Sequence, residues 1–155
     1  MMKCNRGLTL VELIVSVAVL SILALVIAPR FQAPLGEAML NSTAQQIAHD
    51  LRITQQLAIT NGESYRFEIH AANRVYNVRP QNPLKNSMFT VRINRPITRV
   101  TSNFLYIGGG WRGITYTPTG IPGQTGEIII TDSRGRGRAI VVAVATGRAQ
   151  VRTIR

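Results

Sequence analysis

The sequence predicts an α+β fold in which a long N-terminal helix packs on an antiparallel β-sheet domain. Three observations predict it. An apolar stretch runs from Leu8 to Ala28, apolar residues then recur at helical spacing as far as Ala58, and from Tyr65 onward apolar and polar residues alternate. A helical period followed by a series of two-residue periods is the order of elements typical of an α+β domain.

The first half of the helix is predicted over residues 8–29. The stretch from Leu8 to Ala28 would extend about 30 Å as a helix, which matches the hydrocarbon thickness of a bilayer. Lys3 and Arg6 precede it, and basic residues favour the cytoplasmic side of a membrane. We therefore expect a single-pass transmembrane helix, with a cytoplasmic N-terminus and the rest of the chain outside.

The second half of the helix is predicted to be amphipathic, over residues 30–61. Its apolar stripe recurs at spacings of four and three residues and consists of Leu40, Ala44, Ile47, Leu51, Thr54 and Ala58. Asn61 and Gly62 suit the left-handed turn that ends a helix. Pro29 and Pro34 remove backbone donors and predict a bend or an unwound stretch near residues 29–36.

Residues 62–155 are expected to form a globular, β-rich domain of short strands. Runs of Gly, Pro and Ser at 108–110, 118–126 and 133–137 separate the strands as loops. The candidate strands are Tyr65–Ile69, Val75–Val78, Met88–Ile93, Phe104–Ile107, Ile114–Thr117, Glu127–Thr131, Ala139–Ala145 and Ala149–Ile154.

One carboxylate, Glu12, stands inside the apolar stretch, in the segment that runs from Gly7 to Leu13. An ionisable group is costly at such a place, so it normally has a specific role. A glycine, then apolar residues, then a glutamate five residues into the remainder resembles the processing site of type IV pilins and pseudopilins. The resemblance implies that residues 1–7 are a leader peptide, that prepilin peptidase cuts between Gly7 and Leu8, and that Leu8 is then N-methylated.

Other interpretations of the first thirty residues fit less well. A secretory signal peptide would need a small-residue cleavage site after the apolar core, and none follows Ala28. A lipoprotein would place its cysteine after the apolar run, whereas Cys4 precedes it. A plain single-pass membrane anchor remains an alternative.

The pilin resemblance also assigns a role to Glu12. It implies that residues 8–29 form the filament core and that the Glu12 carboxylate meets the N-terminal amine of Leu8 in a neighbouring subunit. The alternative is a glutamate that reaches the membrane surface or is protonated.

The C-terminal part resembles the GspH/FimT family, which joins the H-type pseudopilin of type II secretion to FimT-type minor pilins of type IV pili. The resemblance rests on residues 128–130, a polar turn, residues 140–142, and then Thr146-Gly147-Arg148. The family's terminal hairpin often ends in Gly-Arg-x-Arg. Here the second arginine is Arg152, two positions late, and a literal Gly-Arg-x-Arg occurs at residues 135–138 instead.

The chain has a formal net charge of +11, and its excess of basic residues suggests nucleic acid, anionic lipid or an acidic protein as partner. Six arginines follow the last acidic residue, Asp132, and are expected on two adjacent strands and their turn. They are Arg134, Arg136, Arg138, Arg148, Arg152 and Arg155. Such a positive field could contact DNA phosphates, or it could be solvated or meet acidic pilin neighbours.

These patterns predict a minor pilin or pseudopilin subunit of a type IV pilus-like or type II secretion filament, located in the periplasm or outside the cell after assembly. The alternative is a FimT-like DNA-binding minor pilin for DNA uptake. Predicted partners are other pilin or pseudopilin subunits, prepilin peptidase, the inner membrane and, in the alternative, DNA. Without a catalytic constellation or metal-ligand spacing, we expect no enzyme activity, metal or cofactor. Cys4 is the only cysteine, so the processed chain would contain neither a disulfide nor a cysteine nucleophile.

Overall fold

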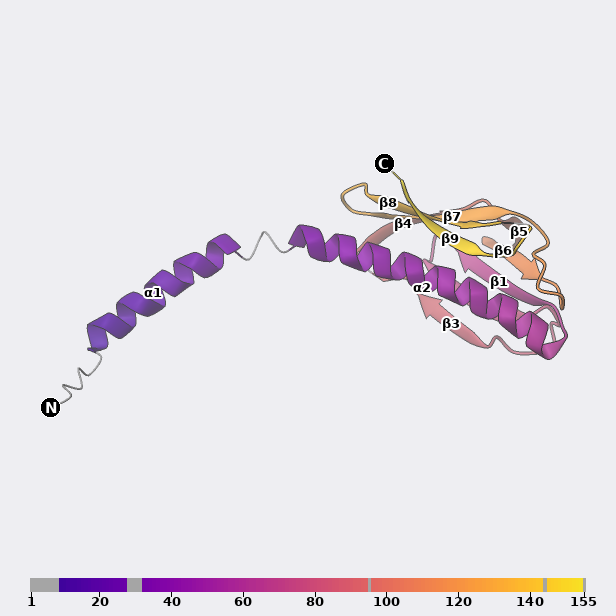
Figure 1. Ribbon diagram of the computed structural model, residues 1–155, viewed down its shortest axis with the longest axis horizontal. Coiled ribbons are helices and arrows are strands. Elements are labelled where there is room, and N and C mark those ends of the chain that lie inside the picture. The colour runs from indigo at the N-terminus through magenta and orange to yellow at the C-terminus, as the bar shows by residue number, and fades with distance from the viewer. Residues whose placement is uncertain (1–8, 28–31, 95, 144, 155) are drawn as a thin grey trace. The chain divides into compact units, whose positions relative to one another are not determined.

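A computed structural model of the chain describes residues 9–27, 32–94, 96–143 and 145–154 (Figure 1). The chain divides into two compact units, Met1–Leu35 and Gly36–Arg155. Helix α1 spans Leu10–Ile27 and helix α2 spans Gln32–Asn61. The strands are β1 (Tyr65–His70), β2 (Val75–Pro80), β3 (Phe89–Arg92), β4 (Ile97–Ser102), β5 (Leu105–Gly108), β6 (Trp111–Tyr116), β7 (Gly126–Asp132), β8 (Gly137–Val142) and β9 (Ala149–Ile154).

The predicted stripe of α2 is confirmed. All six of its residues, from Leu40 to Ala58, are fully buried, and the helix ends at Asn61. Gly62 follows with φ of 62°, a left-handed conformation that glycine adopts without steric cost. The stripe belongs to the same apolar core as buried residues of both sheets.

The predicted unwinding near Pro34 is wrong for residues 32–36. Helix α2 begins at Gln32, so Pro34 lies in its first turn. Backbone N–H groups in the first turn have no carbonyl partner inside the helix, and a proline there removes no helical hydrogen bond. Pro29 and the rest of residues 28–31 lie outside the described residues.

The strands form two sheets, and all their pairings are antiparallel. The first sheet has five strands in the order β3-β2-β1-β6-β5, and the second has four in the order β4-β7-β8-β9. Phe67 and Ile69 of the first sheet and Ile128 and Ile140 of the second are fully buried in the core. The predicted α+β class, with a helix packed on antiparallel sheets, is therefore confirmed.

The sequence analysis missed strand β4 (Ile97–Ser102). Its two buried residues, Ile97 and Val100, are three positions apart, so the strand lacks the two-residue period. A register shift against β7 between Ile97 and Arg99 accounts for the extra residue. Such an irregularity inserts one residue into a strand and hides its alternation from the sequence pattern.

Candidate functional site

Glu12 lies in the first turn of α1, while Gly7 and Leu8 lie outside the described residues. The Glu12 backbone N–H donates to the Thr9 hydroxyl at 3.3 Å, and the Leu13 N–H donates to the Thr9 carbonyl at 3.2 Å. Thr9 is therefore the N-cap of α1, and Thr9-x-x-Glu12 has the residue pattern of a capping box. The sequence analysis missed this local role, although the Thr-x-x-Glu pattern before an apolar run could have indicated it.

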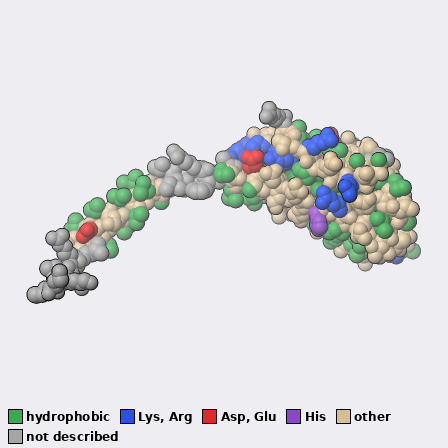
Figure 2. All heavy atoms as spheres, viewed as in Figure 1, with side chains coloured by type: hydrophobic (Ala, Val, Ile, Leu, Met, Phe, Trp, Pro, Cys, Tyr) green, Lys and Arg blue, Asp and Glu red, His purple; other side chains and the backbone are tan. Residues whose placement is uncertain are grey.

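Helix α1 exposes large apolar side chains, from Leu10 at 75% to Val19 at 50%. Hydrophobic side chains lie along its visible face (Figure 2). A helix that is apolar all round is normally buried by surrounding apolar groups. Among the described residues, no helix is long and apolar enough to cross a membrane.

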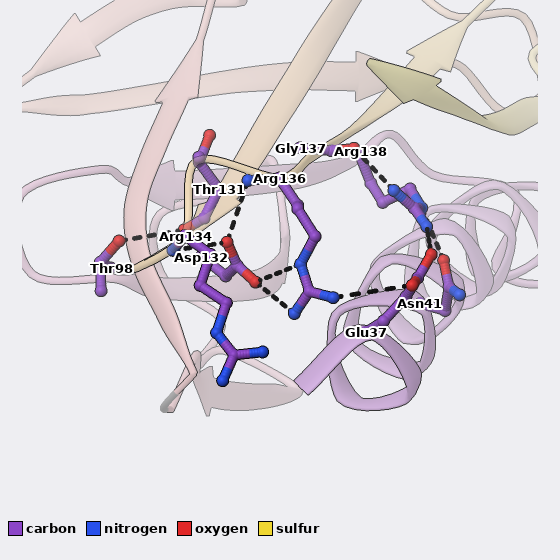
Figure 3. Close-up of polar contacts among 9 residues, drawn as sticks. All are labelled: Glu37, Asn41, Thr98, Thr131, Asp132, Arg134, Arg136, Gly137 and Arg138. Carbon is purple, nitrogen blue, oxygen red and sulfur yellow. Dashed lines mark hydrogen bonds and ion pairs between the residues drawn. The ribbon is translucent and has the colours of Figure 1, made fainter. Parts of the chain in front are cut away.

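The turn between β7 and β8 is organised by the buried carboxylate of Asp132 (Figure 3). Its Oδ1 accepts hydrogen bonds from the backbone N–H groups of Arg134 and Arg136, at 2.9 and 3.0 Å. The Arg136 guanidinium donates to Oδ2 through Nε at 2.9 Å and through Nη2 at 2.7 Å. Burial alone raises the pKa of the Asp132 carboxyl. The hydrogen bonds and the charge of Arg136 outweigh burial and hold the pKa below its ordinary value.

Arg138 connects strand β8 to the beginning of α2 (Figure 3). It is only 6% exposed, and its guanidinium donates to Asn41 Oδ1 at 2.6 Å and to Glu37 Oε1 at 3.1 Å. Arg136 also lies 3.6 Å from Glu37 Oε2. Glu37 thus bridges two of the six C-terminal arginines, and these contacts hold the helix against the β7–β8 hairpin.

The structure consequently divides the predicted group of arginines. Arg136 and Arg138 pair with acidic groups, and Arg134 is exposed in the same turn. Arg148 and Arg152 are exposed at and after the turn between β8 and β9, and Arg155 lies outside the described residues. Arg134 and Arg148 lie near opposite ends of β8, about 20 Å apart, and do not share one surface, whereas Arg152 is paired with Ala139 of β8, next to Arg138.

Arg148 instead shares a cleft with helix α2. The cleft has a volume of about 520 Å³ and is lined by Arg52, Gln55, Gln56, Arg148, Ala149 and Gln150. Arg52 Nη2 donates to the Ala149 carbonyl at 3.1 Å. None of the described residues lining the cleft is acidic. The sequence analysis missed Arg52 because it is distant in sequence from the C-terminal arginines.

Gly147 allows Arg148 to stand beside α2. It adopts φ of 65°, and a Cβ added there would lie 2.5 Å from Gln55 Nε2. The same Gln55 amide donates to the Gly120 carbonyl at 2.8 Å and to the Thr146 carbonyl at 3.2 Å. The Gly-Arg pair therefore has a structural reason, which is a tight turn fastened to the helix.

Within the described part of the chain, no group of three or more His, Cys, Asp or Glu side chains could hold a metal ion. Tyr116 is fully buried and unavailable for stacking on nucleic-acid bases.

Comparison with protein families identifies the chain. Residues 2–28 match the prokaryotic N-terminal methylation motif, and residues 43–147 match the type II transport protein GspH. The chain belongs to the GspH family. The N-terminal methylation motif and the GspH domain together make it a minor pilin- or pseudopilin-type subunit of a type II secretion or type IV pilus filament, as the sequence predicted.

Solved structures show that the fold of this GspH-family protein recurs at very low sequence identity. The minor pseudopilin EpsH of the Vibrio cholerae type 2 secretion system is 10% identical, with a TM-score of 0.56 over 74% of this chain and 95% of EpsH. The type IV minor pilin FimU of Pseudomonas aeruginosa is 12% identical, with a TM-score of 0.59 over 77% of this chain and 95% of FimU. No protein with a curated description matches the sequence.

Proposed function

We propose that this GspH-family protein is made as a prepilin, is cut between Gly7 and Leu8, is N-methylated at Leu8, and joins its filament through α1. One observation carries the proposal: a methylation motif over residues 2–28 precedes a GspH domain over residues 43–147 in the same chain. The exposed apolar surface of α1 supports it, because such a helix requires apolar neighbours from outside its own chain.

The proposed role of Glu12 in assembly is electrostatic. In an apolar filament core, an isolated carboxylate is costly, whereas a carboxylate beside the charged amine of a neighbour's Leu8 gains a strong attraction. The pair would set the axial position of an incoming subunit. Before assembly, residues 8–29 would hold the subunit in the inner membrane in a single pass, with residues 30–155 outside.

The processing proposal is tested by mass spectrometry of the membrane-associated protein. We expect a peptide that begins with N-methylated Leu8. An intact Met1 terminus, or a terminus created after Ala28, would contradict the proposal.

The assembly proposal is tested with Glu12→Gln and Glu12→Ala, followed by quantification of the subunit in sheared filaments. Glutamine can still serve in a capping box but carries no charge. We therefore expect both variants to be stable in cells and both to be poorly incorporated. A Ser16→Ala variant in the same exposed helix is the control and should assemble normally. If Glu12→Gln assembles as well as wild type, the carboxylate acts only as a cap.

A second candidate function, DNA binding during DNA uptake, is favoured by the cleft that joins Arg52 to Arg148. Two arginines, three glutamine side chains and no carboxylate form a surface suited to phosphate, because guanidinium groups bind phosphate oxygens bidentately. Arg152 lies on β9, four residues beyond Arg148, and is also exposed. DNA contacts of this kind would be independent of base sequence.

The DNA hypothesis is tested with the full chain in detergent and unrelated duplexes over a range of salt concentrations. Replacing both Arg52 and Arg148 by Gln should weaken binding of every duplex. It should also reduce the slope of log affinity against log salt concentration by the equivalent of about two phosphate contacts. The exposed arginines Arg92 and Arg99 provide a matched double control. Equal effects of the two double variants would indicate diffuse attraction to a basic protein, and no binding at low salt would reject the hypothesis.

We also infer that the protein does not catalyse a reaction. The GspH family consists of structural filament subunits, and the residues discussed above bind one another or line clefts without a nucleophile and base in contact.

A further inference from the structure

The outer face of the first sheet contains a hollow that the filament role does not explain. On β1, Phe67 and Ile69 point into the core, so Arg66 and Glu68 belong to the opposite face. Together with Asn77 and Arg79 of β2, they line a hollow of about 370 Å³, which we call the outer hollow. Ile107 of β5 and Trp111 of β6 line its other side.

The hollow is built by the edge strand β5 and by a glycine beneath it. Gly113 of β6 lies opposite Glu68 of β1, and a Cβ at Gly113 would lie 2.5 Å from the end of the Ile107 side chain. The β5–β6 pairing shifts register between Tyr106 and Gly108, next to Ile107. Because Gly113 has no side chain, Ile107 can pack over the sheet and form one wall of the outer hollow.

The charge in the outer hollow is unbalanced. Arg66 and Arg79 are directly opposite each other on β1 and β2. Like charges in directly opposite positions destabilise a sheet. The only carboxylate lining the hollow among the described residues is Glu68, which lies 3.4 Å from Arg66. Arg79 has no ion pair within the described part of the chain, so an anion bound beside it would relieve the repulsion.

A hydrogen-bond acceptor in the outer hollow is also unused. The buried Oδ1 of Asn77 accepts no hydrogen bond from any described residue. An unsatisfied buried acceptor costs free energy, and nearly all such atoms in folded proteins have a donor. Asn77 lies opposite Glu68 in the sheet, beside the two arginines.

The remaining wall is apolar. Trp111 packs edge-on against His70, with ring centroids 5.3 Å apart, and Ile107 is 38% exposed. Leu105 of β5, which lies opposite Gly113 on the same face, is 66% exposed. Exposed apolar groups around a polar centre are typical of protein-binding surfaces.

From these contacts we propose that the outer hollow binds a peptide segment of another protein chain, one in which a carboxylate side chain adjoins a large apolar side chain. The carboxylate lies between Arg66 and Arg79, and the apolar side chain packs on Trp111 and Ile107. The net charge of +11 favours an acidic partner. A bare inorganic anion would leave the apolar wall uncovered.

Trp111 provides the measurement, because it is the only tryptophan in the sequence. The full chain in detergent is titrated with the peptide N-acetyl-Leu-Asp-amide while tryptophan fluorescence is recorded. We expect a saturable change with a dissociation constant on the order of 1 mM or tighter, as suits a ligand of this size. N-acetyl-Leu-Asn-amide, which lacks the charge, should bind about tenfold more weakly.

Variants locate the site. Arg79→Gln should weaken binding of the Leu-Asp peptide about tenfold, and Arg79→Lys should retain part of the affinity because it keeps the charge. Arg99→Gln removes the same charge from an exposed position on β4 and should leave the affinity unchanged. Arg79→Gln should melt no lower than wild type, since it removes a like-charge pair.

Three results would overturn the proposal. They are the absence of a saturable response, equal weakening by Arg79→Gln and Arg99→Gln, and displacement of the peptide by inorganic phosphate at equal concentration. None of these results concerns processing at Gly7 or the role of Glu12, so the proposed function is tested independently.

Discussion

The two helices of this chain handle apolar residues in opposite ways. In α1 large apolar side chains are exposed, and side-chain hydrogen bonds among its described residues, such as that from Ser16 to the Glu12 carbonyl, are local to the helix. In α2 one stripe is fully buried while Met39 and Ile59, outside it, are 44% and 47% exposed. The more apolar helix is thus the more exposed one.

This difference shows that the periodicity of apolar residues, more than their number, determines whether a helix packs on its own domain. A stripe at helical spacing can be covered by one sheet surface, whereas a helix that is apolar all round needs neighbours on every side. Helix α2 therefore buries its stripe within the chain, and we propose that neighbouring subunits cover α1. The predictions below test this contrast.

The largest expected effect is on the core contact of α2. Leu51→Ala should lower the free energy of unfolding by about 2–5 kcal/mol, because it removes a fully buried side chain and leaves a cavity. Leu13→Ala, at a position 57% exposed in α1, should change it by less than about 0.5 kcal/mol. Urea unfolding of the full chain in detergent, followed by Trp111 fluorescence, measures both. A similar loss for both variants would mean that α1 also depends on the domain.

The next effect concerns the beginning of α2. Arg138→Gln should destabilise the domain by about 2 kcal/mol, because it breaks charge-assisted hydrogen bonds of a buried guanidinium to Glu37 and Asn41. The expected destabilisation is modest because Glu37 is half exposed and solvent screens its charge. Hydrogen exchange of backbone amides near Asn41 should quicken. Arg152→Gln, at an exposed position on β9, is the control. An equal loss of stability in that variant would contradict the role assigned to the buried contacts of Arg138.

Low pH should destabilise the turn between β7 and β8, which the Asp132 carboxylate organises. The folded-state pKa of Asp132 is lowered, so its contribution to stability is fully present above the unfolded-state pKa of about 4 and is lost as pH falls through the lower folded-state value. Unfolding free energy measured from pH 6 downward should therefore decrease below about pH 4. Asp132→Asn should flatten that part of the profile, and an unchanged profile would count against the role of the carboxylate.

The smallest effect is confined to α1. Thr9→Ala removes the hydroxyl that accepts the Glu12 N–H and should destabilise the first turn of α1 by about 1 kcal/mol. Hydrogen exchange of the Glu12 amide in detergent should quicken. The urea midpoint of the domain should remain unchanged, because none of the core residues among the described residues lies in α1.

Sequence reasoning predicted the features whose signals are local. The stripe from Leu40 to Ala58, the end of α2 at Asn61 and strand β9 (Ala149–Ile154) follow from periodicity and turn chemistry, and all three are as expected. Strand β4 was missed because an irregular pairing with β7 breaks its period, and the effect of Pro34 was overestimated because its place in the first turn was not known. A pattern of residue types does not reveal such positional details.

The sequence by itself determined the family, the fold class and the processing motif, since each depends on residue types at fixed spacings along the chain. Only the tertiary structure decided which arginines are available. Folding brings Glu37 to Arg136 and Arg138, about a hundred positions away, and brings Arg52 to Arg148. It also places Arg79 opposite Arg66 in a hollow with an unused acceptor. The physical reason is that charge interactions depend on distance in space, and spatial neighbours far apart in sequence are set by strand pairing and core packing.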